Sequence, residues 1–82
     1  MSETAVATLA GIINEGLGRD VGPITEETRL EDIGVNSLEL VEILMTIEDR
    51  YDLSIELDAV EAREKLQSVG DLIALGKAHG IV

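Results

Sequence analysis

Residues 37–51 place the strongest restriction on how this chain folds, because two apolar patterns run through one stretch. The first pattern has the spacing of a helix face that packs on a core: Leu40, Ile43, Leu44, Ile47 and Tyr51. An α-helix turns by about 100° per residue, which places a second apolar row on another side of the same helix: Leu38, Val41 and Met45. The stretch therefore predicts an α-helix with one face in the core and a second apolar row outside it. The alternative, that the second row is also core, stays open at this point.

The remaining apolar pattern is also helical, so the predicted fold class is all-α. A first helix over about residues 4–17 is indicated by apolar residues at helical spacing, which are Val6, Leu9, Ile12, Ile13 and Leu17. Gly16 and Gly18 give that helix a plausible end. Apolar side chains toward the C-terminus supply the surface that closes the core: Leu66, Val69, Leu72, Ile73 and Leu75.

Two later helix starts are marked by pairs of polar residues. Asp58 with Glu61 predicts the start of a short third helix, and Ser68 with Asp71 predicts the start of a fourth that ends at Gly80. We therefore expect four helices, and we expect residues 1–82 to form a single domain, because no internal repeat or linker divides them.

Two longer segments connect the predicted helices. Residues 19–36 are long for a loop in a compact domain, and Ile24, Leu30 and Ile33 are predicted to hold this loop to the core. Residues 53–57 alternate like a β-strand, but the sequence offers no second strand for pairing. We interpret them as an extended connector in which Ile55 is buried.

Size and charge limit the possible functions. A chain of 82 residues buries only roughly 60–65% of its unfolded surface, which argues against a deep catalytic cleft and against an enzymatic function. The net charge of -11 opposes binding to nucleic acid or anionic membrane and favours basic protein surfaces as partners. No stretch is long enough to span a bilayer, and residues 1–4 lack the basic start of a signal peptide. These features predict a cytoplasmic protein.

Ser37 is the candidate functional residue. It stands in the run from Ile33 to Glu42, IGVNSLELVE, where a glycine-containing loop is predicted to become a helix. Asn36 is a favoured N-cap residue, and Glu39 three residues later completes a capping-box pattern. The start of a helix has unpaired N–H groups and a partial positive charge, so an anion on the Ser37 oxygen would be favoured by about 0.3–1 kcal/mol. The simpler interpretation is that Ser37 only helps to start the helix.

This run resembles the acyl carrier protein family, in which 4'-phosphopantetheine is attached to the serine of a Gly-x-Asp-Ser-Leu motif at the start of the second helix. The resemblance extends over nearly the whole chain, including the helix order, the long first loop and the valine that opens the last helix, here Val69. It implies a four-helix bundle with a short third helix, a covalent 4'-phosphopantetheine on Ser37, and acyl groups held as thioesters on that arm. Family members also shelter acyl chains between their helices, and the aliphatic core here is expected to open similarly.

Partners follow from the same resemblance. They are a phosphopantetheinyl transferase and acyl-transferring, ligating or condensing enzymes with basic docking surfaces. The family's recognition positions correspond here to Leu38, Val41, Glu42, Met45, Glu48 and Asp49, with Glu39 and Glu56 as further acidic candidates. Residues 37–52 contain five acids and one base, for a net charge of -4, which suits electrostatic steering toward such partners.

One position departs from the family pattern. Asn36 replaces the family's aspartate and removes a negative charge beside Ser37, which implies weaker modification by a typical transferase or a specialised carrier with its own enzymes. Peptidyl carriers more often have a Gly-Gly-His/Asp-Ser type of motif and a less acidic second helix, so the acyl branch fits better.

No catalytic or metal site is predicted. The chain has no cysteine, and its single histidine, His79, is predicted to be a surface residue near the end of the last helix. Nucleophilic catalysis by Ser37 would need a base that the sequence does not place beside it.

The sequence therefore predicts a discrete, monomeric carrier in fatty-acid, polyketide or related biosynthesis. The alternatives are a carrier of aminoacyl or peptidyl groups, and an unmodified module that binds proteins through its acidic helix.

Overall fold

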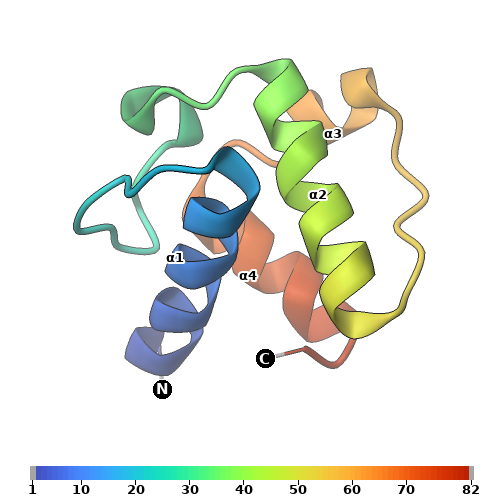
Figure 1. Ribbon diagram of the computed structural model, residues 1–82, viewed down its shortest axis with the longest axis horizontal. Helices are drawn as coiled ribbons and strands as arrows, with labels where there is room; N and C mark the ends of the chain where they lie inside the picture. Colours follow the sequence, from blue (N-terminus) through green and yellow to red (C-terminus); the bar gives the residue numbers. More distant parts are fainter. Residues whose placement is uncertain (1, 82) are drawn as a thin grey trace.

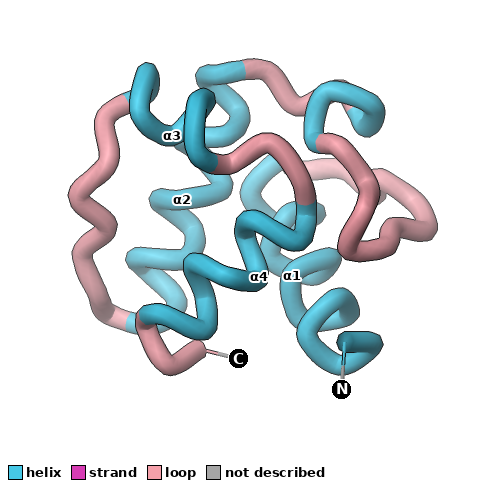
Figure 2. The backbone as a smooth tube through the Cα atoms, turned by 180° about the vertical axis from the view of Figure 1, so that it is seen from behind, coloured by secondary structure: helices cyan, strands magenta, loops and turns pink. Residues whose placement is uncertain are grey.

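The computed structural model describes residues 2–81 and contains four α-helices. In chain order the elements are α1 (Ser2–Leu17), the 3-10 turn η1 (Leu30–Ile33), α2 (Ser37–Tyr51), α3 (Ala59–Lys65) and α4 (Val69–Ala78). Figures 1 and 2 show helices and loops, with no strand in this part of the chain. The predicted all-α bundle with a long first loop and a short third helix is confirmed.

The core lies between the helices and receives side chains from all four of them and from η1. The most deeply buried side chains include Leu9, Ile12, Ile13, Ile43, Ile47, Val69 and Leu72. The helix α1 crosses α2 closely at Gly16, where an added Cβ would lie 3.1 Å from Ile43 Cα. This close approach brings the α2 core face against α1 without an intervening side chain.

All three predicted helix starts form capping boxes. Glu39, Glu61 and Asp71 each donate a backbone N–H to the side chain of the cap residue three positions earlier. Two donor–acceptor distances are 2.8 Å, at α2 and α3, and the third is 3.2 Å, at α4. In return, the side chain of each of these residues accepts the N–H of its cap residue, so two otherwise unpaired donors are satisfied at each helix start.

The long loop of residues 18–36 is held to the helices at several points. Leu30 is buried, and Ile24 and Ile33 are partly buried against the core, as the sequence predicted for an ordered loop. Backbone bonds tie the middle of the loop to the start of α4, with Val69 N–H donating to Thr28 O at 2.9 Å. The loop therefore brings η1 beside the α3–α4 junction.

Three predictions of side-chain placement or helix end need correction. Tyr51 is 36% exposed and is not part of the core, because it is the last residue of α2. Ile55 is half-buried, because the extended connector of residues 52–58 runs along the outside of the molecule (Figure 2). His79 is exposed as predicted but caps α4 from just beyond its last residue, Ala78, with Gly80 following in the left-handed conformation.

Candidate functional site

The loop that leads into α2 places Ser37 through a short series of local bonds. Gly34 has φ 80°, a left-handed conformation that ends η1 and turns the chain toward α2. Val35 is buried, and its N–H donates to Leu30 O at 3.0 Å. Arg19, two residues beyond the end of α1, donates from Nη2 to the carbonyl oxygens of Ile33 and Gly34, at 3.1 and 3.3 Å, and also holds this turn.

Ser37 is the first residue of α2 and is half-buried. Asn36, immediately before it, takes the N-cap position, and this places the Ser37 hydroxyl at the positive end of the helix. Arg63 of α3 approaches from the other side, where its Nη1 donates to Ser37 Oγ at 3.4 Å. Figure 1 shows why this contact exists, because α3 lies beside the start of α2. The hydroxyl thus faces two sources of positive potential.

A cavity of about 320 Å³ opens beside Ser37, and we call it the Ser37 cavity. Its apolar lining consists of Leu30, Val35, Leu40 and Leu66, and its polar lining includes Arg29, Glu31, Asn36, Arg63 and Gln67. A ligand chain attached to Ser37 would therefore contact both aliphatic and polar side chains in this cavity.

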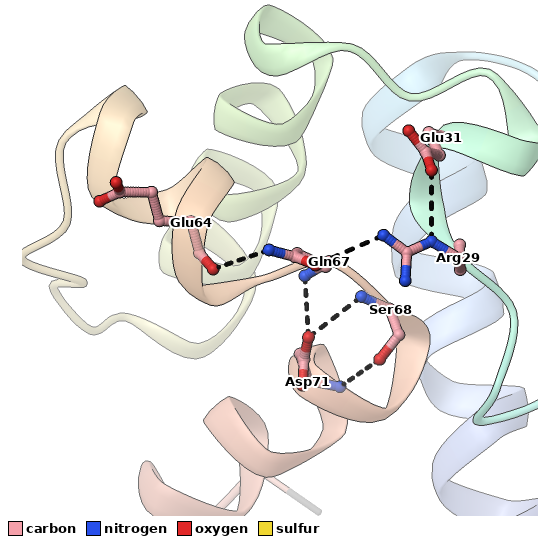
Figure 3. A network of polar contacts seen from close by, with 6 residues as sticks. All are labelled: Arg29, Glu31, Glu64, Gln67, Ser68 and Asp71. Carbon is pink, nitrogen blue, oxygen red and sulfur yellow. Dashed lines mark hydrogen bonds and ion pairs between the residues drawn. The ribbon is translucent and has the colours of Figure 1, made fainter.

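One wall of the Ser37 cavity is a polar network that joins the long loop to the α3–α4 junction (Figure 3). Arg29 donates to Glu31 Oε1 at 3.2 Å and to Gln67 Oε1 at 3.4 Å. Gln67 is itself held, since its Nε2 donates to Glu64 O at 3.1 Å and its N–H to Asp71 Oδ2 at 2.8 Å. The wall is thus built from residues far apart in the sequence.

Comparison with known proteins bears on this site. A profile for the phosphopantetheine attachment site matches residues 7–75. An acyl carrier protein from an Exiguobacterium species is 44% identical over 63 residues, covering 76% of each chain. The acyl carrier protein of Clostridium acetobutylicum is 42% identical over 69 residues, covering 83% of this chain and 86% of that protein. That of Streptococcus pneumoniae is 40% identical over 63 residues, covering 77% and 78%.

The chain belongs to the acyl carrier protein family. As a member it is a carrier that tethers acyl groups on a covalently attached 4'-phosphopantetheine, and its partners include a phosphopantetheinyl transferase and biosynthetic enzymes. Among residues 2–81, every helix is too short or too polar to span a bilayer.

The surroundings of Ser37 fit a phosphopantetheine group. The phosphate would meet the N-terminal end of α2 and the Arg63 guanidinium, both of which favour an anion. The Ser37 cavity lies beside the same hydroxyl and offers room for part of an attached chain. When bound, the group would supply the thiol that holds an acyl group as a thioester, and the residues that line the Ser37 cavity would contact that arm.

The predicted second apolar row of α2 lies on the outside of the carrier. Leu38 is 70% exposed and Met45 is 56% exposed, while Val41 between them is half-buried. Glu42 and Asp49 are exposed acids on the same helix. We call this set of Leu38, Val41, Glu42, Met45 and Asp49 the docking face. The row is therefore not part of the core, and the alternative that all three of its residues are core residues is wrong.

The other acidic candidates have structural contacts or lie elsewhere. Glu39 is half-buried and completes the α2 capping box, with its Oε1 accepting the Asn36 N–H at 3.2 Å. Glu48 is half-buried, and its Oε2 accepts the Ile55 N–H at 2.8 Å, which holds the α2–α3 connector to the helix. Glu56 is exposed on that connector and lines a separate surface hollow that does not include Ser37.

Sequence reasoning missed two residues of this region. Arg63 contacts Ser37, and Val60 is an apolar residue of α3 that is 68% exposed. Neither follows from a local pattern, because the packing of α3 against α2 decides what lies beside Ser37. A weak signal existed in the sequence, since Arg63 is one of only six Lys and Arg residues in a chain with 17 acids.

Proposed function

We propose that Ser37 is the attachment residue and that this carrier presents acyl thioesters to enzymes of fatty-acid, polyketide or related biosynthesis. The observation that carries the proposal is the position of the Ser37 hydroxyl at the start of α2, within reach of Arg63 and beside the Ser37 cavity. The family match includes this residue, because the matched range is 7–75. The acyl branch is favoured over aminoacyl or peptidyl carriers by relatives that are acyl carrier proteins.

Attachment would transfer the phosphopantetheine half of coenzyme A to Ser37. A phosphodiester bond forms between Ser37 Oγ and the phosphate next to pantetheine, and the adenosine bisphosphate half of coenzyme A leaves. The diphosphate bond of coenzyme A breaks in the same step, and a base supplied by the transferase takes up the hydroxyl proton of Ser37.

The experiment that tests this proposal is the intact mass of the chain after incubation with coenzyme A and a broad-specificity transferase. We expect the mass of one phosphopantetheine group to be added, and peptide mapping to locate it on Ser37. If no transferase adds that mass, the proposal gives way to the alternative of an unmodified interaction module. Loading with amino acids, and not with fatty acids, by a cognate ligase would support the peptidyl alternative instead.

The docking face is proposed to bind partner enzymes that carry basic surfaces. Its two most exposed apolar residues, Leu38 and Met45, would supply contact area, and Glu42 and Asp49 would steer the encounter. The net charge of -11 adds a long-range attraction to any basic partner. A single domain over residues 1–82, a monomeric state and a cytoplasmic location stay predictions from the sequence.

Asn36→Asp is expected to speed modification by a typical acyl-carrier transferase. Aspartate caps a helix as well as asparagine does, so the bond to the Glu39 N–H, now 2.8 Å, should persist with little change in stability. The added charge beside Ser37 should attract basic residues of the transferase. Initial rates of mass gain at low salt check this result. An unchanged or lower rate would rule out a recognition role for this position.

Glu42→Lys is expected to slow association with a basic partner by roughly three- to tenfold at low salt and to flatten its salt dependence. Glu42 is exposed, and its carboxylate has no hydrogen-bond or ion-pair partner among the described side chains of residues 4–81. Glu27→Lys is the matched control, because it changes the net charge equally on the exposed long loop. Stopped-flow association rates check the prediction, and equal slowing in both variants would contradict a specific role for the docking face.

Glu48→Lys is a less clean probe of docking, although Glu48 was predicted to be a recognition position. The substitution would also remove the acceptor of the Ile55 N–H, so a loss of binding would mix charge with disorder of the connector.

A further inference from the structure

Arg63 is placed as a cation beside the attachment point. Its Nη1 donates to Ser37 Oγ at 3.4 Å, and its side chain lines the Ser37 cavity. Within residues 4–81, whose side chains the structure describes, the ion pairs formed by arginine are Arg29 with Glu31, at 3.2 Å, and Arg50 with Glu15, at 3.5 Å. Arg63 therefore has no carboxylate partner in the described part of a chain that carries 17 acids.

The position of Arg63 is set by the helix that carries it. The Asp58 capping box starts α3, and Ala62 is completely buried against the core, which determines the side of α3 that faces inward. Arg63, the next residue, is exposed and reaches the start of α2 across the α2–α3 contact. With only seven residues, α3 depends on such tertiary contacts for its stability.

We propose that Arg63 pairs with the phosphodiester on Ser37 and that attachment of phosphopantetheine thereby ties α3 to the start of α2. This inference rests on the proposed attachment at Ser37. A guanidinium presents several N–H donors in a plane and binds phosphate oxygens more strongly than it binds a neutral hydroxyl. Attachment thus replaces the weak contact of the unmodified chain with a charge-assisted one. As a result, α3 is held more strongly to the start of α2 in the modified carrier than in the unmodified one.

Attachment of phosphopantetheine should therefore raise the stability of the domain, and this effect should depend on the side chain of Arg63. In the unmodified carrier, removing Arg63 costs a single long hydrogen bond at the surface. In the modified carrier, it also removes the counter-charge of the phosphodiester. The pair is solvent-exposed, so its contribution should be modest and should decrease as salt is added.

The test compares wild type, Arg63→Ala and Lys65→Ala, each as unmodified and fully modified protein. Lys65→Ala is the matched control, because Lys65 is an exposed cation two residues away on α3 that does not line the Ser37 cavity. We expect attachment to shift Tm upward by roughly 4 °C more in wild type and Lys65→Ala than in Arg63→Ala at low salt. This difference should shrink at high salt. Intact mass confirms complete modification before each melt.

A second measurement does not depend on global stability. The ³¹P chemical shift of the phosphodiester should move between wild type and Arg63→Ala and should stay the same in Lys65→Ala. If mass is gained on Ser37 but the Tm increments and ³¹P shifts are equal in all three proteins, the role of Arg63 is overturned and the attachment stands. If wild type gains no mass with any transferase, the attachment at Ser37 is overturned and this inference falls with it.

Discussion

Ser37→Ala is expected to abolish the gain in mass that coenzyme A and a transferase give the wild-type chain. The substitution removes the hydroxyl that lies at the start of α2, in contact with Arg63 and beside the Ser37 cavity. Alanine is the best helix former, and the capping box of α2 uses Asn36 and Glu39, so the fold should remain intact. Intact mass and circular dichroism of the same sample separate a lost attachment site from a lost fold.

Ser68→Ala is the matched control for this experiment, because Ser68 also stands at a helix start. Its Oγ accepts the Asp71 N–H at 3.2 Å and serves as the cap of α4, so we expect it not to be the attachment point. Loss of that cap should lower the free energy of unfolding by about 1 kcal/mol while the mass gain persists. A mass gain that survives Ser37→Ala, or disappears in folded Ser68→Ala, would assign the attachment to another residue.

Ile43→Ala is expected to lower the free energy of unfolding by about 2–5 kcal/mol. The side chain is completely buried at the place where α2 crosses α1, and Gly16 on the facing helix has no side chain of its own to fill the cavity. Typical small domains have only about 5–15 kcal/mol of stability, so this single change should remove a large share of it. Urea denaturation followed by circular dichroism measures the loss.

Met45→Ala, two residues further along α2, is the contrasting change. Met45 is 56% exposed, so its truncation should alter the free energy of unfolding by only about 0.5 kcal/mol or less. It should instead lower the affinity for a partner enzyme, because Met45 belongs to the docking face. A destabilisation of Met45→Ala as large as that of Ile43→Ala would place the second apolar row in the core and remove half of the proposed docking surface.

The helices, their starts and the position of Ser37 were predictable from the sequence because each depends on residues close together in the chain. A capping box joins positions three apart, as in Asn36 with Glu39, and the core face of α2 repeats within two turns. The mistaken placement of Tyr51 arose at the end of such a repeat, where the periodicity continues but the last residue of the helix is exposed. The spacing of residues within each segment predicted the helices, but it did not predict which residues at a helix end are buried.

Only the tertiary structure decided what surrounds Ser37. Arg63 lies 26 positions from Ser37, and Gln67 lies 38 positions from Arg29, yet all four residues line one cavity. The role of Glu48 in holding the α2–α3 connector is likewise set by the path of the chain after α2. Such contacts depend on how the buried faces of four helices fit together, and the spacing of residues in one helix carries no information about that fit. The sequence alone therefore determined the helices and the candidate serine, and the packing of α3 against α2 decided its charge environment.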